Sequence, residues 1–287
     1  MEKKKKRFSI PRLNSTTLRK NVDSAIRNRR GHRPISADRE GGDTVIASYN
    51  VHKCVGLDKI FNPERIVNVI SELNADIVGL QEIDKRFGER IGLLDLDYLK
   101  ERTGLKPVPI QAMSSMGHGW HGNGLFFRNG DIKDVHQISL PGLEPRGAVI
   151  VEFDLAYGPL RVIGAHFGLL HRSRIQQAKT ILAYLETRPD MPTLLIGDLN
   201  EWRIGKGSSL ISLSPLFDLA MGTLPSFPAR FPILALDRVF AYPKNLVSSV
   251  EVHKSALAKV ASDHLPIKAH IDLVGALSTM TVSAKVN

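Results

Sequence analysis

Several features are scarce in this sequence of 287 residues, and the scarcity of each one excludes certain classes of protein. Cys54 is the only cysteine, so no intrachain disulfide can form, which fits a reducing compartment. No apolar run approaches the roughly 20 residues that a membrane-spanning helix requires. The first residues, MEKKKKRF, resemble the basic start of a signal peptide, but no apolar segment follows them. We therefore expect a cytoplasmic protein without a transmembrane segment.

Positive charge is concentrated at the N-terminus. The chain has a formal net charge of +10, and residues 1–42 carry 13 Lys and Arg against 4 Asp and Glu, a net charge of +9. The remaining residues carry 26 against 25, a net charge of +1. We interpret residues 1–42 as a basic, largely disordered leader. It acts either as a solvating tail or as a segment that contacts nucleic acid or anionic lipid at the inner membrane face.

From residue 43 onward, short β-like runs alternate with helical ones. Hairpin-like strand pairs mixed with amphipathic helices predict an α+β or layered α/β domain and not a doubly wound parallel sheet. We place this domain at residues 43–275 and a C-terminal tail at residues 276–287. Asn62 and Ser173 are the expected N-caps of the two clearest helices, and Pro63 follows in the first turn. The expected strands cover residues 44–50, 76–82, 147–155, 159–167, 193–200, 236–242 and 265–273, and the helices cover residues 62–74 and 173–187.

Polar residues follow the apolar strands at their ends. They include Asn50, Glu82, His166, Asp198, Asn200, Asp237, Asp263 and His264. A carboxylate just beyond a rigid strand is well placed to hold a hard cation through oxygen. Carboxylates that meet at one sheet edge repel one another unless a cation lies among them. The sequence therefore predicts a divalent-metal site.

The same residues supply the parts that phosphoester hydrolysis requires: a metal, an activated water and help for the leaving oxygen. His264 can accept the proton of the water if Asp237 orients its other ring nitrogen. The charge of Asp237 raises the pKa of that imidazole, so a neutral-to-alkaline optimum is expected. Asn50, Asn200 and His166 can donate hydrogen bonds to phosphate oxygens.

Seven segments in order resemble the motifs of the endonuclease/exonuclease/phosphatase superfamily. They are SYNVH (48–52), GLQEID (79–84), GNGLFFR (122–128), GAHFG (164–168), LLIGDLNEW (194–202), LDRVF (236–240) and SDHLPI (262–267). The resemblance implies a four-layer α/β/β/α sandwich, in which two mixed sheets are flanked by helices and the site lies at one sheet edge. It also implies dependence on Mg²⁺ or Mn²⁺.

The resemblance further implies a role for each matched residue. Glu82 is the principal metal ligand, with Asn50 and Asp263 close to the metal, and Asp198 positions or deprotonates the attacking water. Asn200 holds a phosphate oxygen, and His166 contacts phosphate or acts as an acid. Asp237 orients His264, and both His264 and Asp198 remain candidates for the base.

For the other candidate binding residues, a purely structural role explains the sequence equally well. Asn123 either binds phosphate or supports its Gly-rich turn, and Arg146, Arg172 and Arg174 either bind phosphate or lie on the surface. His118 and His121 suggest a second metal site, but without carboxylates at ligand spacing a loop is the better interpretation.

The substrate is open between several classes. The leading hypothesis is a phosphodiesterase that acts on a lipid or a small phosphodiester, and the alternative is a nonspecific nuclease on nucleic acid. The active-site tyrosine of the related DNA-repair enzymes has no convincing counterpart, and His166 stands in the matching motif, which disfavours a repair role. A catalytically silent binding module is the third hypothesis, and the full set of polar residues disfavours it.

Overall fold

The computed structural model describes residues 42–219 and 223–284. The predicted basic leader, apart from its last residue, therefore lies outside the described residues. Among the residues that are described, no helix is both long and apolar enough to cross a membrane.

Eleven strands form two mixed sheets. The six-stranded sheet has the order β10 (Val247–Val252), β11 (Ile267–Ile271), β1 (Thr44–Asn50), β2 (Ile77–Gln81), β4 (Gly124–Phe127) and β3 (Lys106–Pro107). Its strands β1 and β2 run parallel and its other pairs antiparallel. The five-stranded sheet has the order β5 (Asp131–Leu140), β6 (Arg146–Leu155), β7 (Gly158–His166), β8 (Thr193–Asp198) and β9 (Asp237–Tyr242), with only β7 and β8 parallel.

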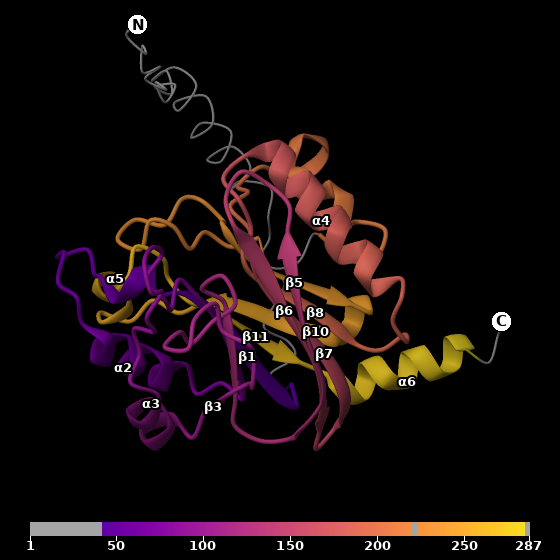
Figure 1. Cartoon of the computed structure of the whole chain (residues 1–287). Helices are drawn as coiled ribbons and strands as arrows, with labels where there is room; N and C mark the ends of the chain where they lie inside the picture. The colour runs from indigo at the N-terminus through magenta and orange to yellow at the C-terminus, as the bar shows by residue number, and fades with distance from the viewer. Residues whose placement is uncertain (1–41, 220–222, 285–287) are drawn as a thin grey trace, which may run out of the picture. The chain divides into compact units, whose positions relative to one another are not determined.

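Three buried clusters separate four layers. One lies between the sheets, where Ile46 and Ile77 pack with Val149, Val162 and Ile196. A second cluster buries α2 (Pro63–Leu73), α3 (Leu96–Thr103) and α5 (Ala258–Ala261) against the six-stranded sheet. A third buries α4 (His171–Leu185) and the 3-10 helix η3 (Ser209–Leu213) against the five-stranded sheet. Figure 1 shows α2 and α3 on one side of the strands and α4 on the other, which confirms the predicted α/β/β/α sandwich.

The N-termini of helices α2 and α4 can be compared with the N-caps predicted from the sequence. Asn62 accepts a hydrogen bond from the backbone N–H of Arg65 at 2.9 Å, and Pro63 is the first residue of α2, as predicted. The cap predicted at Ser173 is wrong, because α4 already begins at His171 and Ser173 is buried inside it. The N-cap position belongs to Leu170, which provides no side-chain bond.

Helix α6 (Leu273–Ala284) occupies most of the segment that the sequence assigns to a tail. The carboxylate of Asp43 accepts the N–H groups of Leu273 and Val274 at 3.0 and 3.1 Å, which ties the start of this helix to the start of β1. Leu273 and Ala276 are buried in the core between the sheets. The expected boundary at residue 275 therefore falls inside a helix. Three further 3-10 turns, η1 (His52–Cys54), η2 (Gly205–Gly207) and η4 (Lys244–Leu246), complete the elements.

One glycine allows β7 and β8 to pair closely beside the polar strand ends. Gly197 has φ +146°, and a Cβ at this position would lie 1.8 Å from the carbonyl oxygen of Ala165 on β7. Only glycine fits this approach without moving the backbone. The next residue, Asp198, thereby ends β8 directly opposite His166.

Candidate active site

Three polar residues lie in one row across the end of the five-stranded sheet. The register pairs His166 of β7 with Asp198 of β8, and Asp198 with Asp237 of β9. Asn50 reaches the row from the other sheet, because its Nδ2 donates to Oδ2 of Asp198 at 3.0 Å. These residues are up to 187 positions apart in the sequence, and the site combines residues from both sheets.

His264 and Asp237 form a buried pair. Nδ1 of His264 donates to Oδ2 of Asp237 at 2.8 Å, and the hydroxyl of Ser226 donates to the same oxygen. The ring of Phe227 packs against the imidazole with 4.8 Å between the ring centroids. Burial lowers the pKa of His264, but the charges of Asp237 and Asp198 outweigh it and raise this pKa to about 10. Nε2 of His264 lies 3.7 Å from Asp198.

Asp198 is the centre of the constellation. Its Oδ2 lies 3.4 Å from Nε2 of His166, and its Oδ1 accepts the backbone N–H of Asn200 at 3.0 Å. Burial raises the pKa of Asp198 and the charge of His264 opposes that effect, which leaves a value of about 6. A carboxylate with this pKa can exchange a proton near neutral pH.

Arg146 determines which nitrogen of His166 carries the proton. Nη1 of Arg146 lies 3.0 Å from Nδ1 of His166, and a guanidinium can only donate, so Nδ1 accepts. Burial, followed by the charge of Arg146, holds the pKa of His166 well below its usual range. His166 is therefore neutral, with its proton on the Nε2 that faces Asp198.

Glu82 lies just beyond β2 in a left-handed conformation, with φ 59°. Its carboxylate forms an ion pair with the ammonium of Lys53. Burial raises the pKa of Glu82, but Lys53 outweighs this effect and lowers the pKa below its ordinary value. Glu82 is therefore ionised and already attracts a cation.

The oxygen donors near Glu82 fit a hard divalent ion. Mg²⁺ is typically bound by one or two carboxylates together with substrate phosphate oxygens. Glu82 supplies an ionised carboxylate, and Asn50 an amide oxygen that also accepts the backbone N–H of His52 at 3.0 Å. Asp263 supplies a part-exposed carboxylate that lies 3.8 Å from Nδ1 of His52. Asp198, Asp237 and His264 also present ligand atoms within 4.8 Å of one another. Asp237 and His264 are bonded to each other there, however, so we favour the Glu82 group for the metal.

Three predicted phosphate contacts have other partners. Nδ2 of Asn123 donates to the carbonyl oxygens of Trp120 and Gly147 at 3.1 and 3.2 Å, so this buried side chain supports its turn. Nδ2 of Asn200 donates to the carbonyl oxygen of Phe167 at 3.0 Å, and its φ of 51° turns the chain after β8. Arg174 is buried and paired with Glu201 at 3.1 Å, which removes it from the phosphate-binding candidates.

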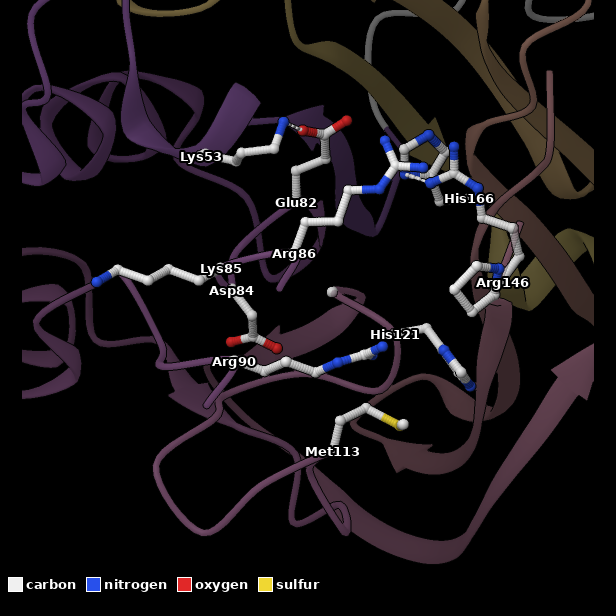
Figure 2. Close-up of a pocket in the computed structure, with 12 residues that line it drawn as sticks. Lys53, Glu82, Asp84, Lys85, Arg86, Arg90, Met113, His121, Arg146 and His166 are labelled. Atoms are coloured by element: carbon white, nitrogen blue, oxygen red, sulfur yellow. Dashed lines mark hydrogen bonds and ion pairs between the residues drawn. The ribbon is translucent and has the colours of Figure 1, made fainter. Parts of the chain in front are cut away.

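A pocket opens beside Glu82 and His166. It encloses about 540 Å³, including space open to solvent. Figure 2 shows Lys53 and Glu82 meeting on one side, Arg86 extending toward His166, and Arg90 extending toward His121. The lining residues are Lys53, Glu82, Asp84, Lys85, Arg86, Arg90, Met113, His121, Gly122, Pro145, Arg146 and His166.

Left-handed backbone conformations gather around this site. Nine non-glycine residues among those described have positive φ, and most of them follow the strand ends of the site or line the pocket: His52, Lys53, Cys54, Glu82, Arg90, His121 and Asn200. Such conformations cost roughly 1–3 kcal/mol each and persist where the surrounding structure imposes them. Their clustering supports a functional origin of this geometry.

The sequence analysis missed Lys53, Ser226, Arg86 and Arg90. Ser226 opens the segment SFPARFP, and its contact with Asp237 spans 11 residues of irregular chain. Lys53 directly follows one matched motif and Arg86 lies two residues after another, so their positions near strand ends were the available signal.

Comparisons with known proteins place this geometry in a family. The model of the Endonuclease/Exonuclease/phosphatase family matches residues 47–264. No curated protein sequence matches the chain. The endonuclease/exonuclease/phosphatase from Beutenbergia cavernae DSM 12333 is a similar solved structure, with 21% identity and a TM-score of 0.60 over 82% of this chain and 73% of that one.

Two further similar structures bear more specific names. A mannosyl-6-phosphatase from Bacteroides thetaiotaomicron VPI-5482 has 18% identity and a TM-score of 0.60, with 80% of this chain and 99% of that chain covered. TDP2 of D. rerio, in complex with a single-stranded DNA product, has 16% identity and a TM-score of 0.54, with 79% and 97% covered. At these identities the likeness shows the fold alone, whereas the family model spans more than half of the chain. The chain therefore belongs to the endonuclease/exonuclease/phosphatase family, whose members are phosphoester hydrolases.

Proposed function

We propose that the protein is a divalent-metal-dependent phosphodiesterase that acts by direct attack of water on a lipid or small phosphodiester. The observation that carries the proposal is the row of His166, Asp198 and Asp237, with the His264–Asp237 pair facing Asp198. When bound by Glu82 with Asn50 and Asp263, Mg²⁺ or Mn²⁺ would neutralise the phosphate and acidify the water.

The proton transfers follow from the two pKa values. Asp198, with a pKa of about 6, is ionised at neutral pH and accepts a proton from the attacking water. His264, with a pKa of about 10, is protonated and donates from Nε2 to the leaving oxygen. The 3.7 Å between Nε2 of His264 and Asp198 then allows the proton to return and resets both groups. Arg146 and neutral His166 donate hydrogen bonds to the remaining phosphate oxygens.

The pH profile tests this assignment. We expect kcat/KM to fall as the pH drops below about 6, where Asp198 becomes protonated, and to fall again above about 10, where His264 loses its proton. The profile is measured on bis(4-nitrophenyl) phosphate in the wild type and in Asp198→Asn, which should lose the acidic limb. A rate that climbs steadily from neutral pH to pH 10 would instead make neutral His264 the base.

Metal removal tests the hydrolase proposal itself. EDTA is expected to lower turnover by at least about 100-fold, because neutralising the phosphate supplies several kcal/mol of transition-state stabilisation, and Mg²⁺ should restore it. Mg²⁺ should also raise the thermal unfolding temperature of the wild type but not of Glu82→Gln, because binding to the folded state alone stabilises it. Turnover that persists in EDTA-treated, metal-free protein would contradict the proposal.

The substrate class is tested by parallel assays on plasmid DNA, anionic phospholipid vesicles and soluble phosphodiesters. A nonspecific nuclease remains the second candidate, because the leader carries a net charge of +9 and one similar structure holds a DNA product. Cleavage confined to the plasmid would favour it. Inactivity of Mg²⁺-loaded and Mn²⁺-loaded protein on all three would favour a silent binding module.

A further inference from the structure

The pocket beside Glu82 is far more basic than the domain around it. Its lining includes five cationic side chains, Lys53, Lys85, Arg86, Arg90 and Arg146, against the carboxylates of Glu82 and Asp84. The chain after residue 42 has a net charge of only +1. The cations are therefore concentrated at this opening and do not reflect the composition of the domain.

Neither carboxylate forms an ion pair with the arginines that line the pocket. Glu82 is paired with Lys53. Asp84 is buried, and its two oxygens accept the backbone N–H groups of His118 and Gly119 at 2.8 and 2.9 Å. Asp84 thus ties the segment that bears Arg86 and Arg90 to the loop that bears His121. Within residues 42–219 and 223–284, no ion pair joins Arg86, Arg90 or Arg146 to a carboxylate.

The cationic groups also act on one another. Burial lowers the pKa of Arg146, the charges of Glu144, Asp198 and Glu82 oppose this effect, and the charge of Arg86 adds a smaller lowering. Burial lowers the pKa of His121, with added effects from Arg90 and Arg146. Nε of Arg146 is buried and has no hydrogen-bond partner among the described residues. Such repulsion and such an unpaired donor are relieved when anionic oxygens enter the pocket.

Figure 2 shows the arginines of the pocket in two separate places. Arg86 extends toward His166 and Arg146, where the phosphoester to be hydrolysed would lie, whereas Arg90 extends toward His121 across the pocket. The two places lie in the same pocket, which is open to solvent.

The lining residues also restrict the chemical nature of the part of the ligand that is not anionic. Among the described residues that line the pocket, none is Phe, Tyr or Trp. Nucleobases are commonly held by stacking on such rings, so this lining suits a polar, non-aromatic group such as a polyol.

Given the proposed hydrolysis of a phosphoester, we propose that the pocket binds a second phosphate group of the substrate. Arg90 holds that phosphate and Arg86 bridges it to the phosphoester beside Glu82 and His166. The substrate is therefore a small polyol that carries one phosphoester for hydrolysis and another phosphate for recognition. Such a group occurs either as a lipid headgroup or in a soluble molecule.

Two matched pairs of probes separate these sources. The lipid pair is phosphatidylglycerol and phosphatidylglycerol phosphate in phosphatidylcholine vesicles, and the soluble pair is their deacylated counterparts. Binding of the soluble pair is measured by calorimetry in EDTA, so that no turnover occurs, and hydrolysis of both pairs is followed in Mg²⁺. The full-length wild type is compared with Arg90→Gln and Arg86→Gln/Arg90→Gln. Arg102→Gln is the control, because Arg102 is exposed on α3 and does not line the pocket.

The wild type should bind the probe with two phosphates at least about ten-fold more tightly than the probe with one, because charged hydrogen bonds from the half-buried Arg90 contribute enough for that factor. Arg90→Gln should lose most of this preference while keeping its affinity for the one-phosphate probe, and Arg102→Gln should retain it. A preference for the two-phosphate member in the vesicle pair alone would identify a lipid as the source of the ligand. The same preference in both pairs would show that a soluble molecule is a source as well.

Absence of a wild-type preference for the two-phosphate member in both the soluble and the vesicle pair, or a preference that survives in Arg86→Gln/Arg90→Gln, would overturn the second-phosphate site. Failure of the proposed function has a different signature, namely no Mg²⁺-dependent hydrolysis of any probe. The affinity ratio in EDTA can be read in either case.

Discussion

Replacing His264 with glutamine is expected to lower the turnover of the Mg²⁺-loaded enzyme by about 10²- to 10⁴-fold, the range that a positioned proton donor contributes. The glutamine amide can still donate a hydrogen bond to the buried Asp237, so the fold should survive. It has no proton to release at neutral pH, however, and the leaving oxygen loses its donor. Turnover is measured on a soluble phosphodiester, with the fold checked by circular dichroism and thermal unfolding.

His136→Gln provides the matched control. His136 pairs with Asp134 on the edge strand β5, and the same substitution there should leave turnover near the wild-type value. Combining His264→Gln with Asp198→Asn should lower turnover little more than the worse single change does, because the two residues take part in the same series of proton transfers. A well-folded His264→Gln protein with near wild-type turnover would remove His264 from the mechanism.

Replacing Arg174 with methionine is expected to destabilise the protein by about 3–5 kcal/mol, because it leaves the charge of Glu201 buried without its partner. The guanidinium of Arg174 donates to Glu201 at 3.1 Å, to the hydroxyl of Ser209 at 2.9 Å and to the carbonyl oxygen of Leu169 at 2.6 Å. Glu201 is fully buried, and although burial raises its pKa, hydrogen bonds from Ser209 lower that pKa below the ordinary value. The free energy of unfolding is measured in urea at neutral pH.

The double variant Arg174→Met/Glu201→Gln separates an unpaired charge from lost packing. It should recover part of the stability lost in Arg174→Met, since the neutral amide needs no counter-charge. Arg172→Met is the control, because Arg172 is exposed on the same helix. A loss no larger than that of Arg172→Met would show that the pair contributes little.

Much of the site was predictable because its residues directly follow buried strands. Asn50 and Asp198 each end a run of apolar residues, and parallel or antiparallel pairing then carries such ends to a common edge. The central strands were predictable for the same reason, whereas the four-layer sandwich was implied by the resemblance of the ordered motifs. Their buried runs are long enough to leave a clear pattern in the sequence.

The missed elements have weak patterns. Strands β5 and β10 lie at sheet edges and are largely half-buried or exposed, so their apolar residues do not form continuous runs. Helix α6 is apolar or small around most of its circumference and shows no clear face in the sequence. The structural role of Asn123 was also not predictable, because two of its contacts are backbone carbonyls whose positions depend on β6 and on a turn.

The Asn50–Asp198 hydrogen bond has a consequence for how activity is acquired during folding. It spans 148 residues and crosses from one sheet to the other, so no fragment and no half-assembled intermediate contains the complete catalytic geometry. Contacts between such distant positions are made late, after long stretches of chain have been ordered. Recovery of turnover after dilution from denaturant consequently reports docking of the two sheets, the step that makes the molecule an enzyme.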